Sequence, residues 1–309
     1  MNGRRIGLVL DGGGGKGAYQ IGVWKALHEL GWDRNVTAIA GTSVGGLNAA
    51  LFVQGSYENA ERIWLHEISR LKVTRLQMKL EELIDDFIDT KAFSQSSIDC
   101  FLATHCAGQN GEFCEYAADG RSVEKYVNGE MSYHNLRVVS EKDCGTWLKK
   151  CSTPKAVMLA TSALPLLCRK VRIGSRLHED GGVPWGGDNS PVYPLLGSSA
   201  CDEVIVIHLD VLAGYAPYDK QRYREQGIAV HEILPSVPLD QMGLLTGTLN
   251  FKPEHAARLI EAGYRDSMSV FKSYLQIDTL GEKARKLEQQ KLAYEAALQK
   301  AKAYLLENR

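Results

Sequence analysis

The chain has 309 residues, of which 44% are hydrophobic and 24% charged, a balance typical of globular proteins with a sizeable core. The formal net charge is −1, so the chain lacks the excess of basic residues that is typical of nucleic-acid-binding proteins. The same value argues against purely electrostatic attachment to an anionic membrane. We therefore expect a globular chain without a nucleic-acid partner.

The apolar run near the N-terminus predicts a first strand and not a signal peptide. Basic residues precede the apolar run Ile6–Leu10, but Asp11 interrupts that run too early for a signal peptide, and no apolar run is long enough to span a bilayer. No two cysteines form a Cys-x-x-Cys pair, so we expect free thiols in a reducing compartment, no metal site and a cytoplasmic location. The seven cysteines are Cys100, Cys106, Cys114, Cys144, Cys151, Cys168 and Cys201.

The first 55 residues alternate between strand and helix patterns. Apolar runs predict strands, and apolar residues spaced by three and four predict helices. This order implies an α/β fold with a parallel sheet and right-handed crossovers. The expected elements are a strand at Arg5–Leu10, a glycine loop at Asp11–Gly17, a helix at Ala18–Leu30, a strand at Thr37–Ala40, a turn at Gly41–Gly46 and a helix at Leu47–Val53.

The remaining chain gives weaker patterns. Residues 56–93 are typical of amphipathic helices. Further predictions are strands at Ser97–Ala103, Glu112–Ala117, Ala156–Thr161 and Glu203–Leu209, and a turn at His105–Gly111.

The last segment, residues 281–309, differs from the rest. Apolar residues recur at alternating spacings of four and three from Leu280 to Leu305, as in a heptad seam. Three interpretations stay open: a helix packed on its own domain, a helix for self-association, and a helix on a membrane surface. We divide the chain into a domain at residues 1–250 and a helical C-terminal extension at residues 251–309.

The turn Gly41–Gly45 matches Gly-x-Ser-x-Gly, between a predicted strand and a predicted helix. A sharp turn in this position exposes the serine and strains its backbone, and the helix N-terminus presents amide groups beside it. This context favours Ser43 as a catalytic nucleophile.

The loop Asp11–Gly17 contains four consecutive glycines after a buried strand. Bare backbone amides can stabilise a developing oxyanion, and Lys16 adds positive charge nearby. A tight turn without a ligand is the alternative. The loop also fits the spacing of a dinucleotide-binding motif, but the acidic residue that this motif requires at the end of the second strand is absent. A P-loop is excluded because Leu10 stands where its first Gly is required and Gly17 stands where Ser or Thr is required.

A third motif, His178-Glu179-Asp180-Gly181-Gly182, suggests a carboxylate held on a tight turn. If the turn lies beside the end of the second strand, Asp180 could accept the Ser43 proton, because partial burial makes a carboxylate a better base. The alternative is an ordinary Asp-Gly hairpin turn.

Together these motifs resemble the patatin-like phospholipase family across about residues 5–210, including Ala160–Pro165 and the segment Asp188–Val192. The resemblance implies a three-layer α/β/α fold and a Ser-Asp dyad without histidine. It implies hydrolysis of lipid acyl esters at a membrane surface, with no metal or cofactor. Carried over by position, Ser43 is the nucleophile and Asp180 the general base. Gly13, Gly14 and Gly15 form the oxyanion hole, supported by Gly12, Lys16, Gly17, Gly41, Gly45, Gly181 and Gly182.

Two alternatives compete with the dyad. A Ser-His-Asp triad could draw on His178, His208, His231 or His255, although His208 lies in an apolar strand and has the pattern of a core residue. The second alternative is a non-catalytic module of the same fold that binds acyl lipids or a protein partner.

Overall fold

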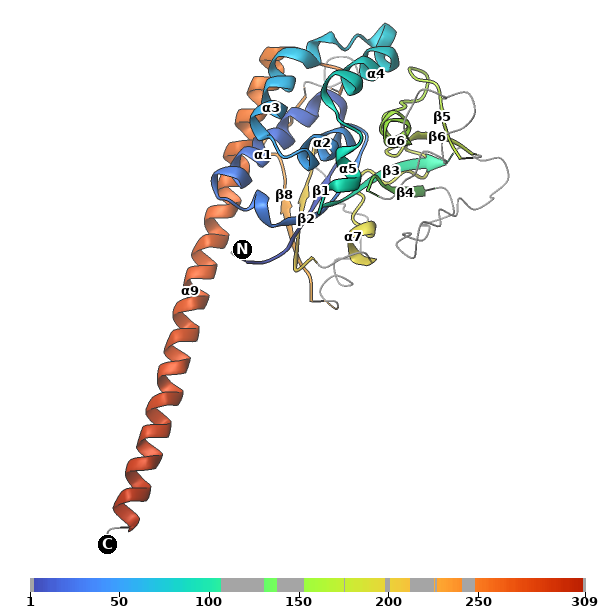
Figure 1. The fold of residues 1–309 in the computed structure, drawn as a ribbon. Coiled ribbons are helices and arrows are strands. Elements are labelled where there is room, and N and C mark those ends of the chain that lie inside the picture. The colour runs from blue at the N-terminus through green and yellow to red at the C-terminus, as the bar shows by residue number, and fades with distance from the viewer. Residues whose placement is uncertain are drawn as a thin grey trace. The chain divides into compact units, whose positions relative to one another are not determined.

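The computed structural model describes residues 3–106, 131–137, 153–174, 176–197, 201–211, 225, 227–240 and 248–307. Their strands form one mixed sheet in the order β5-β6-β3-β2-β1-β7-β8, with β4 also paired to β3 (Figure 1). The parallel strands are β1 (Ile6–Leu10), β2 (Val36–Thr42), β3 (Asp99–Cys106), β7 (Glu203–Ile207) and β8 (Ala229–Ile233). The antiparallel strands are β4 (Met131–Asn135), β5 (Val171–Ile173) and β6 (Arg176–Asp180).

Helices cover both faces of the sheet. Successive side chains of a strand point to opposite faces, and Val9, Ala40 and Phe101 pack on the face covered by α7 (Tyr193–Gly197). Leu102 points to the opposite face, where it meets Gly46 of α2 (Val44–Val53). The expected three-layer α/β/α arrangement is therefore confirmed.

The N-terminal elements follow the predicted alternation. The short 3-10 helix η1 (Gly14–Gly17) and α1 (Ala18–Glu29) follow β1, and η2 (Asp33–Asn35) precedes β2. The helical region after α2 consists of α3 (Tyr57–Arg62), the π-helical turn η3 (Ile63–Glu67), η4 (Ile68–Arg70), η5 (Val73–Arg75), α4 (Leu76–Phe87) and α5 (Ala92–Gln95).

The predicted strand at Ala156–Thr161 is wrong, because these residues belong to helix α6 (Thr153–Thr161). The helix is buried on all sides from residue 154 to 161, and its residues 156–160 form an apolar run without helical periodicity. Such a run does not distinguish a buried helix from a buried strand.

The predicted turn at His105–Gly111 is wrong at its start, since His105 and Cys106 continue β3 and pair with β6. Residues 107–111 and the predicted strand Glu112–Ala117 lie outside the described residues. The expectation of free thiols is wrong for Cys106, which is disulfide-bonded, whereas Cys100, Cys168 and Cys201 form no disulfide.

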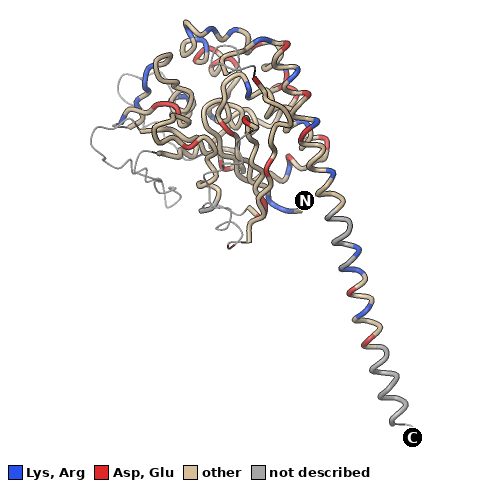
Figure 2. The backbone as a smooth tube through the Cα atoms, turned by 180° about the vertical axis from the view of Figure 1, so that it is seen from behind, with Lys and Arg blue, Asp and Glu red and all other residues tan. Residues whose placement is uncertain are grey.

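The last element is α9 (Pro253–Glu307), which begins well before the predicted tail. The contacts of the chain divide into a unit of residues 2–267 and a unit of residues 268–309 with residue 1. In the second unit Leu287, Leu292 and Tyr294 are exposed, and basic and acidic residues are interspersed along the described helix (Figure 2). The predicted domain boundary at residue 250 stays a prediction.

Candidate active site

Ser43 stands at the turn between β2 and α2 with φ 54° and ψ −124°. A positive φ is strained for any residue with a Cβ, and such strain concentrates at functional sites. Its amide donates a hydrogen bond to Thr161 Oγ1 at 3.0 Å, and that hydroxyl donates to the Ala103 carbonyl at 2.6 Å. The elbow is therefore fixed to β3 through the last residue of α6.

Asp180 approaches Ser43 because β2 and β6 share one edge of β3. Ala103 pairs with both Thr42 of β2 and Tyr133 of β4, whereas Thr104 pairs with Asp180 of β6 and with β4. A strand has only two edges, so β6 continues along the edge that β2 leaves at the elbow. The last residue of β6 thus lies next to the first residue after β2.

The Asp180 carboxylate is buried, with one oxygen anchored and the other unoccupied. Oδ1 accepts a hydrogen bond from the Gly182 amide at 2.8 Å, while Oδ2 has no hydrogen-bond partner among the described residues. Burial raises the pKa of Asp180 to about 6, and the Gly182 amide and the neighbouring Ser43 side chain act in the opposite direction. A carboxylate with this pKa and a free oxygen beside a hydroxyl has the properties of a general base.

The glycine loop runs next to Ser43 and contains backbone amides without a described acceptor. The Gly12 amide donates to the Asn189 carbonyl, and the Lys16 amide donates to the Gly13 carbonyl within η1. The amides of Gly13, Gly14 and Gly15 precede the first bond of this helix and have no acceptor among the described residues. A Cβ on Gly12 would lie 3.2 Å from Ser43 Cβ, so the loop runs directly past the serine.

The loop's own conformation explains its composition. Gly14 has φ 56°, and a Cβ there would lie 2.0 Å from the Thr248 carbonyl oxygen. Only glycine fits such a close approach at a positive φ. Lys16 lies 3.8 Å from the Asp240 carboxylate.

The remaining predicted glycines serve close packing. A Cβ at any of them would lie 2.2–2.7 Å from a neighbouring atom. These positions are Gly12, Gly17, Gly41, Gly45, Gly181 and Gly182.

The consecutive residues Asp188, Asn189 and Ser190 connect the end of β2 to the glycine loop, a role that the sequence did not predict. Thr42 Oγ1 donates to the Asp188 carbonyl at 2.7 Å, and Asn189 bonds Gly12 through its carbonyl oxygen and its side-chain amide. Ser190 Oγ donates to the buried Asp11 carboxylate at 2.6 Å. The resemblance of Asp188–Val192 to the family's segment was the only sequence signal for these contacts.

His208 anchors the start of the glycine loop. Its Nδ1 lies 2.9 Å from Asp11 Oδ2, and its Nε2 lies 3.4 Å from Glu232 Oε1. Burial acts to lower the pKa of His208, but the two carboxylates outweigh it and raise the pKa. This histidine is a buried core residue engaged with Asp11, as its strand pattern predicted.

An apolar pocket opens beside Ser43. It is bounded by the elbow, the helical region 64–80 and the segments after α6 and before α9. Its lining residues are Gly14, Ser43, Val44, Leu47, Asn48, Leu51, Trp64, Ile68, Leu71, Leu76, Leu80, Ser162, Leu164, Leu249 and Phe251. A pocket with so few polar groups next to a nucleophile suits a hydrocarbon chain.

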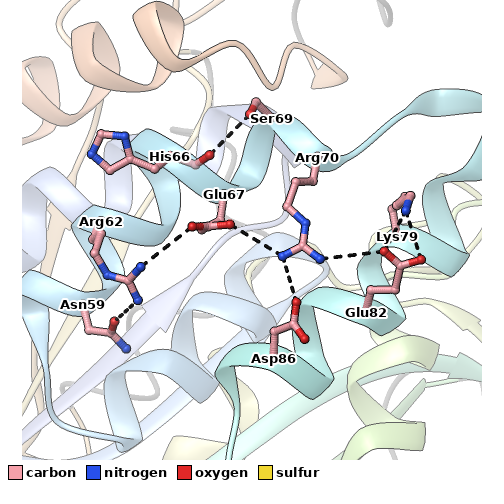
Figure 3. Close-up of polar contacts among 9 residues, drawn as sticks. All are labelled: Asn59, Arg62, His66, Glu67, Ser69, Arg70, Lys79, Glu82 and Asp86. Atoms are coloured by element: carbon pink, nitrogen blue, oxygen red, sulfur yellow. Dashed lines mark hydrogen bonds and ion pairs between the residues drawn. The ribbon is translucent and has the colours of Figure 1, made fainter.

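Ion pairs on the outside hold the helical wall of this pocket (Figure 3). Arg70 of η4 lies 3.5 Å from Glu67 and 2.8 Å from Asp86 of α4, and 3.8 Å from Glu82. Figure 3 shows the Arg70 guanidinium between these carboxylates, with Arg62 on the far side of Glu67. The contacts tie the turn carrying Ile68 to the helix carrying Leu76 and Leu80.

Within the described residues, no group of three or more His, Cys, Asp or Glu side chains is placed to hold a metal ion. In the same part of the chain, no helix combines the length and apolar character needed to cross a bilayer.

A family model described as patatin-like phospholipase matches residues 8–196. The chain belongs to the patatin-like phospholipase family. Among curated proteins, lysophospholipase nte1 of Aspergillus terreus is 50% identical over 52 residues, covering 17% of this chain and 3% of that protein. Patatin-like phospholipase domain-containing protein 7 of Rattus norvegicus is 35% identical over 82 residues, covering 25% of this chain and 6% of that protein. The matches thus span only a few per cent of these relatives' lengths.

Solved structures of patatin-like proteins are more distant. VipD from Legionella pneumophila is 12% identical with a TM-score of 0.45, covering 87% of this chain and 67% of that chain. Human GIVD cytosolic phospholipase A2 is 10% identical with a TM-score of 0.45, covering 88% and 58%.

Proposed function

We propose that the chain is a serine acyl hydrolase that cleaves fatty-acyl esters through Ser43 and Asp180. One observation carries the proposal: Ser43, at a strained elbow, lies beside a buried carboxylate with an unoccupied oxygen and opens onto an apolar pocket. A nucleophile, a base and a site for a hydrocarbon chain are the parts that acyl transfer requires.

The reaction would proceed in two steps. Ser43 Oγ attacks the ester carbonyl as Asp180 accepts its proton, and the amides of Gly13, Gly14 and Gly15 hold the oxyanion. The alcohol leaves with the proton from Asp180, and an acyl-Ser43 ester remains. Asp180 then removes a proton from water, which attacks the acyl carbon. The bond from that carbon to Ser43 Oγ breaks, Asp180 returns the proton to Ser43 Oγ, and the fatty acid is released.

The contacts of the histidines favour a dyad over a triad. His178 Nδ1 bonds Thr104, His208 bonds Asp11, and His255 Nδ1 accepts from Arg258. His231 lies 3.3 Å from Glu203. Burial holds the pKa of His178 well below its ordinary value, which keeps it neutral beside His134.

The substrate we propose is a phospholipid or lysophospholipid, presented at a membrane surface. The pocket supports an apolar acyl chain, and the lysophospholipase relatives suggest the class of headgroup. A cytoplasmic location stays a prediction from the sequence, and the disulfide at Cys106 weighs against a reducing compartment.

The test uses a fluorophosphonate probe and a short-chain nitrophenyl ester on the full chain. We expect wild type to be labelled and active, and Ser43→Ala to lose both properties. Asp180→Asn should lower turnover by about 10²-fold or more while keeping the fold. The matched control is Ser69→Ala, which removes a serine hydroxyl from the outside of the pocket wall.

The outcomes separate two functions. Labelling that survives Ser43→Ala, or near-normal turnover in Asp180→Asn, contradicts the dyad. A folded wild type that takes no label but binds fatty acid in calorimetry would instead favour the acyl-lipid-binding module.

A further inference from the structure

Leu166 combines two unfavourable features at one position. It has φ 70°, a conformation that a branched side chain rarely adopts, and its side chain is 103% exposed. Each feature costs free energy in the folded chain, since left-handed backbone strains a residue with a Cβ and water surrounds the isobutyl group. Strained outliers of this kind mark functional sites more often than random surface.

The surroundings of Leu166 form a surface hollow with a particular composition. Leu76, Met78 and Leu167 contribute apolar surface, and Met78 is 45% exposed. Arg75 and Arg169 line the same hollow, and none of its described lining residues is acidic. The hollow therefore offers aliphatic side chains flanked by two cations.

The backbone beneath this hollow is held in place. The Gln77 side chain donates to the Arg169 carbonyl at 3.1 Å and accepts from the Arg169 amide at 2.9 Å. This double contact joins α4 to the segment that carries Leu166, so the leucine projects from a fixed base.

The hollow lies next to the apolar pocket at Ser43. Leu76 lines both of them, and Leu164 of the pocket precedes Leu166 by two residues. A bilayer that contacts this hollow would therefore lie close to the wall of the pocket that holds Ser43.

We propose that Leu166, Met78, Arg75 and Arg169 form the surface by which this chain docks on an anionic lipid bilayer. The leucine inserts among acyl chains, and the two guanidinium groups bind headgroup phosphates. An exposed apolar side chain with flanking arginines is the composition of an interfacial anchor. The inference rests on the proposed function, because it assigns the surface that delivers substrate to Ser43.

The test measures binding of the full-length protein to vesicles of phosphatidylcholine, with and without phosphatidylglycerol, by co-sedimentation. The Ser43→Ala background is used throughout, so binding is measured without hydrolysis and independently of the catalytic assignment. Leu166→Asn is the main variant, because asparagine tolerates a positive φ and the fold is retained. We expect its partitioning to fall about tenfold. Arg75→Ala and Arg169→Ala should each lower partitioning to the anionic vesicles about fivefold and reduce its dependence on salt.

The matched control is Val237→Asn, since Val237 is 53% exposed but does not line the hollow. It should bind as the parent does. Leu287→Asn tests the tail helix in the same way. Equal binding by Leu166→Asn and its parent, loss of binding only in Leu287→Asn, or no vesicle binding by the parent would each overturn the proposal.

A second readout separates docking from chemistry. With Ser43 intact, Leu166→Asn should hydrolyse a soluble short-chain ester at the wild-type rate but lose activity on vesicles. Equal loss on both substrates would overturn the docking role, whereas failure of Ser43→Ala to abolish ester hydrolysis would overturn only the proposed function.

Discussion

Asp180 links the chemistry of the site to its stability. Its pKa of about 6 exceeds the ordinary value of 3.8 because the carboxyl is buried. The folded chain therefore holds this proton more tightly than the unfolded chain does. Wild-type stability should consequently fall as the pH rises from about 4 to about 6, by about 3 kcal/mol from this group.

Asp180→Asn removes this pH dependence. We expect the variant to be more stable than wild type at pH 8, with the difference shrinking below pH 5, in urea unfolding at both pH values. Activity should show the opposite trend, since wild-type turnover rises through pH 6 as the base ionises. Equal stabilities at pH 8 would contradict a buried, ionised Asp180.

Ser162 presents a similar conflict between stability and function. Its hydroxyl is buried without a partner among the described residues, and its side chain lines the pocket beside Ser43. Removing an unpaired buried hydroxyl should stabilise the chain by about 1 kcal/mol. We expect Ser162→Ala to gain stability and to lose about fivefold in kcat/KM, because the hydroxyl would bond the polar part of the ester.

Ser132 in β4 provides the control for Ser162, since its hydroxyl is also buried and unpaired within the described chain but does not line the pocket. Ser132→Ala should gain stability without a change in kcat/KM. An equal kinetic loss in both variants, or no loss in Ser162→Ala, would remove the role of Ser162.

At the scale of elements, the ion pairs of Arg70 control the mobility of the pocket wall. Arg70→Ala frees α4 from η4, so we expect faster hydrogen exchange in residues 76–87 and a higher KM for long-chain esters. The melting temperature should change little, because exposed ion pairs contribute little to global stability. High salt should increase exchange in wild type as well.

Arg5→Ala is the matched control, because the exposed Arg5 side chain forms an ion pair with Asp202 and has no described contact with η4 or α4. Its exchange in residues 76–87 should match wild type. A short-chain ester that fills less of the pocket should also be hydrolysed normally by Arg70→Ala. Unchanged exchange in Arg70→Ala would show that packing alone holds the wall.

The sequence predicted those elements of the site whose signals are local. The glycine loop, the elbow and the aspartate turn each occupy fewer than ten consecutive residues, and each carries its own strand or helix context. The Thr161–Ser43 and Asp188–Thr42 bonds join residues 118 and 146 positions apart. No local pattern predicts such pairs, so these hydrogen bonds around the site became visible only in the folded structure.

The failure at Ala156–Thr161 has the same origin. Complete burial removes the polar side of a helix, and with it the periodicity that identifies one. The resemblance to a family predicted Asp180 as the partner of Ser43, but it contained no information about which edge of β3 brings the two residues together.

At the scale of the whole molecule, apolar residues of the predicted heptad seam are exposed in the unit of residues 268–309. Self-association through this seam stays a prediction. Leu287 and Tyr294 are exposed and lie seven residues apart, so they occupy the same heptad position on one side of the helix. We expect Leu287→Lys to shift the sedimentation coefficient of the full chain toward the monomer at micromolar concentration. Gln290→Lys, off the seam, should sediment as wild type does, and a monomeric wild type would contradict self-association.

The shared edge of β3 has a consequence for how this chain tolerates change. The spacing between nucleophile and base is set by adjacent rungs of one hydrogen-bond ladder, Thr42 with Ala103 and Asp180 with Thr104. Two residues from the segment between Cys106 and Arg176 support the same spacing, because Thr161 accepts from the Ser43 amide and the Ala163 carbonyl accepts from the Asp180 amide. A register slip of a single residue in β3 would misalign the pair and turn its side chains to the wrong face. Substitutions that preserve the distance between Ser43 and Asp180 are therefore most constrained in the eight residues of β3 and at Thr161.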